Sequence, residues 1–197
     1  LHDLSPLIEA VHHACNAGAY DEAYRIYFER IRQHKRSLLV GRLKAFSTNL
    51  ALMREFFPHG DTSREPHLSR PQDKRLILDE MALCLTNLGR LPEALTFHER
   101  SILLSLRAND WSSASSIYRS LADIHSQLGA LDASAKASRE AFALALRTED
   151  RGAQRNSLYR QAWAAHLCGD QEIASLVFRQ AEKLEKELNS NVRHLYG

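Results

Sequence analysis

Apolar side chains recur along the chain at the three- and four-residue steps of an amphipathic helix. The clearest run has steps of four, three, four, three and four: Leu39, Leu43, Phe46, Leu50, Met53 and Phe57. This spacing places all six side chains on one helical face, so it predicts one long helix over residues 39–57. Residues 58–70 hold two prolines, one glycine and several charges, which predicts a loop.

Glycine and small residues repeat every 40 positions in the second half of the chain. The columns are Gly89, Gly129 and Gly169; Ala82, Ala122 and Ala162; Ala94, Ser134 and Ala174; and Ser101, Ala141 and Ala181. Each copy predicts two helices, the first ending at its glycine and the second beginning about two residues later. Such a short turn allows only an antiparallel helix hairpin, and small residues let the two backbones approach closely.

A more degenerate hairpin is predicted near the N-terminus. Ser5 and Pro6 begin its first helix, Gly18 ends it, and residues 20–23 begin the second. Ser69 and Gln72 match a capping box for the helix that follows the loop. We therefore divide the chain into two parts. Residues 1–70 hold a degenerate hairpin, a long helix and a loop. Residues 71–197 hold three regular hairpins and the start of a further helix at 191–197. Both parts are expected to form one continuous solenoid.

The columns of small residues and the glycine between the helices resemble the tetratricopeptide repeat (TPR). The period of 40 is six longer than the usual 34, which implies helices about one turn longer, and HEAT and armadillo repeats have periods nearer to 40. The chain lacks a proline inside the first helix of each hairpin and a regular Asp/Arg ladder, so TPR is favoured. The resemblance implies an all-α, right-handed α-solenoid of stacked hairpins.

Composition narrows the classes of protein that remain. The chain of 197 residues has a net charge of +2 with histidine neutral and 25% charged residues, which is typical of a globular protein. No apolar run reaches the length of a membrane span. Three widely spaced cysteines suit a reducing compartment, so we expect a cytoplasmic protein. The common nucleotide-binding, hydrolase and zinc motifs are absent, and we expect no enzyme and no cofactor.

Some residues have chemistry that a site could use. His12 and Cys15 are one helical turn apart, but two ligands without a second pair do not make a metal site. His125 and His166 lie near the ends of neighbouring first helices, with no carboxylate that can be assigned to them. Residues 30–75 carry eleven Lys and Arg against four Asp and Glu, a net +7. This segment predicts a basic patch for nucleic acid or another anion, the less favoured alternative: Arg32, Lys35, Arg36, Arg42 and Lys44.

TPR arrays usually bind partners through a concave face made by the first helices. The resemblance places these positions there: Asp79, Leu83, Arg119, Asp123, Tyr159, Trp163 and His166, with Ser116, Asn156 and Arg160 at the margin. Aromatic, acidic and arginine side chains together suit recognition of a protein or peptide. The alternative is that Tyr159 and Trp163 pack in the core. The columns do not reproduce the clamp by which chaperone-adaptor TPRs hold a peptide carboxylate.

Longer strings also resemble one particular family. They are LHDLSPLIEAVHHACNAGAYDEA, KAFSTNLALMREFF, LDEMALCLTNLGRLPEAL, SLADIHSQLGAL and the final HLYG, in that order. Together they are similar to the C-terminal TPR region of bacterial STAND-type NTPases. The resemblance implies a sensor that binds a trigger and contacts an upstream NTPase domain of the same protein. The chain itself contains none of the ATPase motifs.

Overall fold

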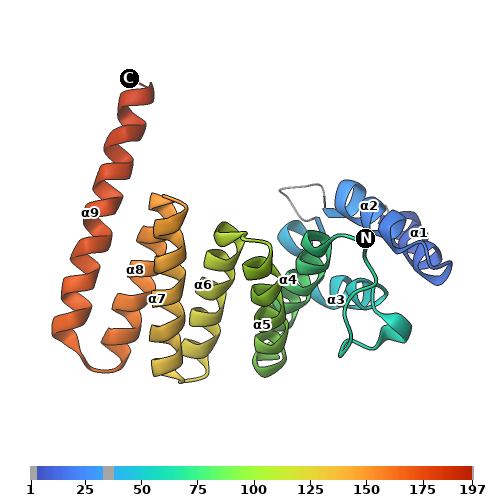
Figure 1. Ribbon diagram of the computed structural model, residues 1–197, viewed down its shortest axis with the longest axis horizontal. Coiled ribbons are helices and arrows are strands. Elements are labelled where there is room, and N and C mark those ends of the chain that lie inside the picture. Colours follow the sequence, from blue (N-terminus) through green and yellow to red (C-terminus); the bar gives the residue numbers. More distant parts are fainter. Residues whose placement is uncertain (1–3, 33–37, 197) are drawn as a thin grey trace. The chain divides into compact units, whose positions relative to one another are not determined.

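The structure, a computed structural model, describes residues 4–32 and 38–196 and contains only helices and loops in these ranges (Figure 1). The chain divides into two compact units, residues 1–104 and 105–197, and each is described by itself. The division falls inside helix α5 (Leu91–Arg107). None of the described helices is both long and apolar enough to span a bilayer.

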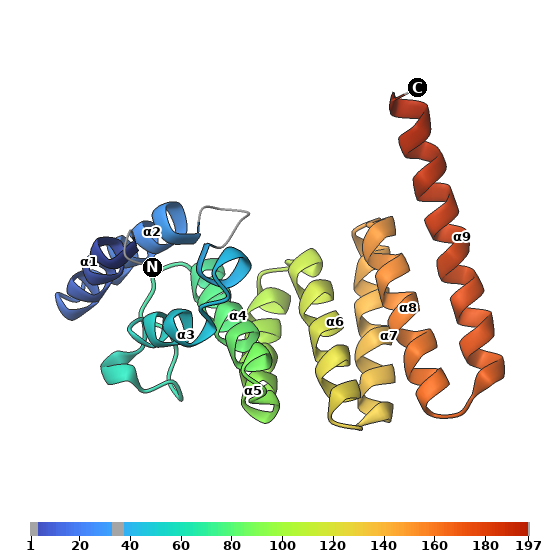
Figure 2. The same cartoon turned by 180° about the vertical axis from the view of Figure 1, so that it is seen from behind.

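The C-terminal unit is built of regular hairpins. Helices α6 (Trp111–Gln127), α7 (Leu131–Arg147), α8 (Arg151–Leu167) and α9 (Gln171–Tyr196) lie side by side in Figures 1 and 2. Gly129 and Gly169 turn the two hairpins with φ of 74° and 83°, in the left-handed region that favours glycine. Asp110 and Asp150 cap α6 and α8, because each side chain accepts a hydrogen bond from a backbone N–H in the first turn. The predicted hairpins are confirmed.

Small residues determine how closely the helices of this unit approach. The Ser134 hydroxyl on α7 donates to the carbonyl of Ala122 on α6, at 2.8 Å. Ser115 on α6 donates to the carbonyl of Ala141 on α7, also at 2.8 Å. A side chain as short as serine can reach the backbone of the next helix only if the helices are in close contact. The columns of small residues therefore mark the helix crossings, as predicted.

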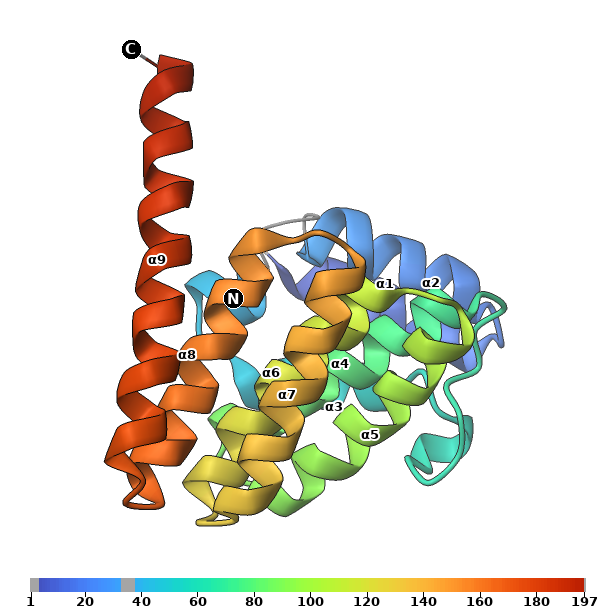
Figure 3. The same ribbon diagram turned by 60° about the vertical axis from the view of Figure 1, so that its left-hand side comes forward.

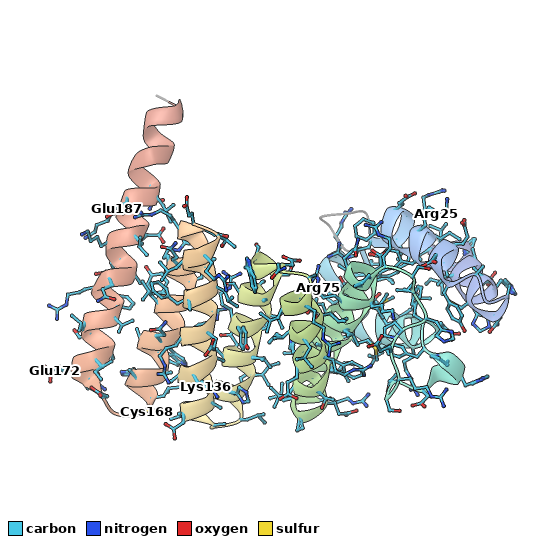
Figure 4. The ribbon with its side chains drawn as sticks, viewed as in Figure 1. Arg25, Arg75, Lys136, Cys168, Glu172 and Glu187 are labelled. Atoms are coloured by element: carbon cyan, nitrogen blue, oxygen red, sulfur yellow. The ribbon has the colours of Figure 1, made fainter. Side chains whose placement is uncertain are left out.

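Helix α9 is longer than its neighbours and extends past the start of α8, as Figure 3 shows. Glu187 pairs with Arg151 at the beginning of α8, and Figure 4 places Glu187 near this end while Cys168 and Glu172 flank the turn at the opposite end. The backbone of residues 191–196 continues α9. The structure thus differs from the prediction of a further helix starting at 191, because α9 runs from Gln171 to Tyr196 without a turn.

The N-terminal unit begins with the predicted hairpin, helices α1 (Ser5–Asn16) and α2 (Tyr20–Ile26), which turns at Gly18 with φ of 76°. Helix α2 continues as a π-helical segment, η2 (Tyr27–Arg32), which the sequence pattern did not indicate. Helix α4 (Pro71–Asn87) and α5 form the first regular hairpin, with Gly89 at φ of 76°. The turn at Gly89 is thus confirmed together with those at Gly129 and Gly169.

The single long helix predicted over residues 39–57 is wrong. The structure has a π-helical segment, η3 (Leu38–Arg42), a break at Lys44 with φ of 54°, and helix α3 (Phe46–Arg54). Phe57 is extended and is followed by a 3-10 turn, η4 (Pro58–Gly60). Leu43 is 46% exposed, whereas Phe56 and Phe57 are both fully buried. Successive residues point about 100° apart on a helix, so a continuous helix would not bury both phenylalanines on one narrow face.

A buried polar network connects three segments of this unit. The Tyr27 hydroxyl donates to Asn49 Oδ1 at 3.2 Å, and Asn49 Nδ2 donates to Glu80 Oε2 at 3.3 Å. Arg32 Nε donates to the other carboxylate oxygen of Glu80 at 2.7 Å. Tyr27, Asn49 and Glu80 are buried, so each polar group depends on the others for its hydrogen bonds. The network joins η2, α3 and α4.

The loop over residues 58–70 is confirmed, but its end differs from the prediction. Ser69 does not cap α4; its backbone N–H and hydroxyl both donate to the Asp21 carboxylate at the start of α2. These bonds, the hydroxyl first, lower the pKa of Asp21. Arg70 is the N-cap and makes no side-chain cap. Arg100 of α5 holds the loop by donating to the carbonyls of Thr62 and Arg64.

Candidate partner-binding surface

An arginine-aspartate pair joins the first helices of neighbouring hairpins in the C-terminal unit. Arg160 of α8 donates from Nε and Nη2 to the two carboxylate oxygens of Asp123 on α6, at 2.7 and 2.6 Å. Its remaining Nη1 donates to the Asn156 carbonyl at 3.2 Å. A two-pronged pair of this kind fixes the orientation of both side chains. The structure therefore brings Asp123 together with a residue that sequence analysis placed only at the margin.

Arg119 lies one turn before Asp123 on α6 and is partly buried. Within the described part of the chain its guanidinium makes no hydrogen bond. Burial lowers the pKa of Arg119, and the neighbouring Arg160 lowers it further, because both disfavour a charged guanidinium. The charge of Arg160 is thus balanced by Asp123, whereas an acidic group of a partner would stabilise the charge of Arg119.

Aromatic side chains of α8 and α9 form a groove, the aromatic groove, with a volume of about 560 Å³. It is lined by Tyr159, Ala162, Trp163, His166, Gln171, Ala174, Ser175 and Phe178. Trp163 is 56% exposed and Phe178 is 47% exposed. Tyr159 leans against Phe178, with ring centroids 5.4 Å apart, and Trp163 lies 5.7 Å from His166. Trp163 is therefore a surface residue and not part of the core.

The local sequence explains why α8 and α9 carry the groove. Gly169 turns the chain, and the Asp170 carboxylate caps α9 by accepting from the Ile173 N–H at 3.0 Å. Ala162 and Ala174 occupy the columns of small residues, so the two helices approach closely beneath the aromatic rings. His166 Nδ1 and Gln171 Oε1 lie 3.2 Å apart across the turn.

Phe178 belongs to this groove although sequence analysis did not select it. Its column contains the buried Ser138 on α7, where the Gln161 side chain of α8 donates to the Ser138 carbonyl at 3.3 Å. The same column holds the buried His98 on α5, so residue size in this column gave no signal for Phe178. Ser138 is buried on α7 whereas Phe178 is 47% exposed on α9, so the two helices differ at this position of the repeat.

The other two residues assigned to the concave face lie on α4 in the N-terminal unit. The Asp79 carboxylate accepts from Arg75 at 3.1 Å and from the Ser101 hydroxyl at 3.2 Å, and lies 3.5 Å from His98 Nδ1. These contacts direct Asp79 toward its own hairpin. Leu83 is 41% exposed. A role for either residue in recognition remains a prediction.

The basic segment is partly neutralised within its own unit. Arg32 pairs with Glu80 and lies 5.4 Å from the centre of the Phe28 ring, while Lys74 pairs with Glu65 at 2.8 Å. Arg42 and Lys44 are exposed. Lys35 and Arg36 lie outside the described residues. The described part of the predicted patch therefore offers Arg42 and Lys44 to an anion.

His12 and Cys15 do not share a surface that suits a metal ion. Cys15 is buried, whereas His12 is half exposed and pairs with Glu55 at 3.2 Å. Burial, and to a smaller extent Glu55, raises the pKa of the Cys15 thiol to about 12, and the thiolate is the form that binds metal. The described residues contain no group of three His, Cys, Asp or Glu that could hold a metal ion.

Comparison with known proteins agrees with this repeat architecture. Residues 74–147 match the tetratricopeptide repeat family. No curated protein matches the chain. Two crystal structures of a Podosopora anserina chain, described as a kinesin light chain with nearly identical TPR-like repeats, are similar at 14% identity. The structure of a variant form has a TM-score of 0.53, and the alignment covers 95% of this chain and 97% of that chain. The other structure has a TM-score of 0.52, and the alignment covers 94% of this chain and 96% of that chain.

At this identity the solved structures establish the fold alone. The fold class is an all-α, TPR-like helical-repeat solenoid, and the match to the tetratricopeptide repeat family covers residues 74–147. Repeats of this kind generally serve protein interaction through extended surfaces.

Proposed function

We propose that this chain is a protein-interaction module without catalytic activity, whose C-terminal unit binds a protein or peptide partner. The observation that carries this proposal is the exposure of Trp163 beside Tyr159 and Phe178 in the aromatic groove. Large aromatic side chains that remain exposed in a concave site are typical anchors of binding. Burying Trp163 beneath a partner would remove this apolar surface from water.

Charged residues of α6 and α8, outside the groove lining, would orient the partner. Arg160 and Asp123 compensate each other, so their side chains are held in place. Arg119 retains donors that no described residue occupies, and a carboxylate of the partner would satisfy them. Aromatic anchors provide affinity, whereas charged groups at the rim determine register and specificity.

We further propose that the chain acts as the regulatory or ligand-sensing region of a larger bacterial signalling NTPase in the cytoplasm. The resemblance of its ordered sequence strings to the TPR region of STAND-type NTPases supports this context. It adds an intramolecular contact with an NTPase domain to the partners. Reading the gene upstream of Leu1 tests this part, and we expect a GxxxxGK[ST] motif. A reading frame that contains no nucleotide-binding motif would contradict it.

The binding proposal is tested with Trp163→Ala. A partner is first captured from the source organism by crosslinking and identified by mass spectrometry, and its affinity is then measured. We expect Trp163→Ala to weaken binding by about 2 kcal/mol or more, roughly thirtyfold, with little change in thermal stability.

Leu146→Ala is the matched control, because Leu146 is 52% exposed on α7 and does not line the groove. This variant should bind as the parent does. Equal affinity of the Trp163 variant and the parent would contradict the proposed anchor. A loss of about 3–5 kcal/mol in stability would instead assign Trp163 a packing role.

A further inference from the structure

A second cavity lies within the N-terminal unit, and none of the residues of the proposed partner surface lines it. It has a volume of about 590 Å³ and is bounded by the end of α1, the start of α2, the end of α3 and the turn at residues 57–60. Cavities of about 300–1,000 Å³ are typical of sites for small molecules. The helix and loop that interrupt the regular repeats form much of its wall.

The lining combines apolar surface with polar groups. Phe57 and Cys15 are almost completely buried and contribute apolar surface. Asn16 and Tyr20 add an amide and a phenol, and the Tyr20 ring is held edge-on to His67 with centroids 5.1 Å apart. A ligand with an apolar body and a polar head matches such a lining better than a bare ion does.

The charged groups favour an anion. Glu55 is the one carboxylate among the described lining residues, and it is already paired with His12 at 3.2 Å. Arg54 and His59 are exposed, and their side chains make no hydrogen bond or ion pair within the described ranges. The planar fork of an arginine matches the oxygens of a carboxylate or phosphate. The cavity therefore presents donors that no described group occupies, whereas its one acid is occupied.

The backbone at the edge of the cavity is also unusual. His59 has φ of 54° and Gly60 has φ of 71°. The left-handed conformation is strained for a non-glycine residue, and such residues gather at binding sites. The turn is held by hydrogen bonds from the Gly60 N–H to the Phe57 carbonyl at 2.9 Å and from the Asp61 N–H to the Pro58 carbonyl at 3.0 Å. His59 is thus kept at the edge of the cavity by a defined turn.

We propose that this cavity binds a small organic anion, a carboxylate or phosphate monoester attached to an apolar body. Arg54 binds the anionic group through its guanidinium, with His59 as a second donor. The apolar body lies against Phe57 and is bordered by Asn16 and Tyr20. The site makes the N-terminal unit a small-molecule binding element that is separate from the proposed partner surface.

Isothermal titration calorimetry of the whole chain with two probes, phenylacetate and phenyl phosphate, tests the site. Phenol serves as the neutral analogue of similar size. We expect one or both anions to bind at least about tenfold more tightly than phenol, because a charge-assisted hydrogen bond contributes about 1.5–3 kcal/mol. Preference for phenylacetate identifies a carboxylate ligand, and preference for phenyl phosphate identifies a phosphate ligand.

Arg54→Ala should weaken binding of the preferred anion by about tenfold or more. Arg30→Ala is the matched control, because Arg30 is exposed in the same unit and does not line the cavity; it should change the affinity less than about twofold. Ala51→Trp fills the cavity from its exposed side and should abolish binding. Neither anion binding at millimolar concentration, or Arg54→Ala binding like the parent, would overturn the proposal. These variants leave Trp163 unchanged, so each proposal fails independently.

Discussion

The two units of this chain hold their helices together by different means. In the C-terminal unit small side chains bring helices into close contact, and serines or glutamines then reach the backbone of a neighbouring helix. Gln154 of α8, for instance, donates to the Ala145 carbonyl of α7 at 3.2 Å. In the N-terminal unit the corresponding role falls to large apolar residues and to the buried network of Tyr27, Asn49, Glu80 and Arg32.

The two units therefore differ in how many buried polar groups depend on one particular partner for their hydrogen bonds. In the C-terminal unit a serine hydroxyl donates to a helix carbonyl that already accepts a hydrogen bond within its own helix. Removing the serine therefore leaves no polar group unsatisfied. Members of the network depend on one another, so removing one leaves others unsatisfied. We therefore expect the N-terminal unit to be more sensitive to polar substitutions and the C-terminal unit to be more sensitive to changes of size.

The largest effect is expected for Glu80→Ala. The change leaves the Arg32 guanidinium and the Asn49 amide without their carboxylate, and breaking a buried pair in this way costs about 3–5 kcal/mol. The free energy of unfolding of the N-terminal unit, measured from hydrogen exchange of amides in α3 and α4, should fall by this amount. Glu99→Ala on the exposed face of α5 is the control and should change it by less than about 0.5 kcal/mol. An equal free energy of unfolding for both variants would show that the network does not stabilise the N-terminal unit.

A smaller effect is expected for Ala122→Leu in the C-terminal unit. Ala122 is buried at the crossing where Ser134 contacts its carbonyl, so the added atoms would push α6 and α7 apart. Overpacking of this kind costs about 1–3 kcal/mol, which thermal unfolding can measure. Ala143→Leu places the same side chain at an exposed position of α7 and should be nearly neutral. Unchanged stability of Ala122→Leu would show that the small column is not a close crossing.

The smallest effect is expected at the turns. Gly129 has φ of 74°, and a Cβ atom there would meet no atom within 4 Å, so Gly129→Ala tests backbone conformation without a clash. The left-handed region costs alanine about 1 kcal/mol, which chemical denaturation should detect. Gly41→Ala in η3 also meets no atom, and φ there is not left-handed, so this variant should be neutral or slightly stabilising. A similar response at both glycines would contradict the role of the turn.

Local signals in the amino-acid sequence predict the regular part of the fold. The period of 40 located the turns at Gly89, Gly129 and Gly169 because each signal is local: a glycine for left-handed φ, a helix start about two residues later, and small residues at the crossings. It also placed Tyr159, Trp163 and His166 together on α8. Residues one turn apart on a helix must share a face, so this grouping needs no knowledge of other helices.

The other features of the fold depend on packing between distant segments. The break at Lys44 and the separate burial of Phe56 and Phe57 depend on what surrounds them, whereas the apolar spacing of residues 39–57 is equally compatible with one helix. The network of Tyr27, Asn49 and Glu80 joins residues up to 53 positions apart, and no local pattern marks such partners. The exposure of Trp163 and the place of Phe178 in the groove likewise follow from how α8 and α9 meet. Periodicity reports which face a side chain occupies, and only packing determines whether that face is covered.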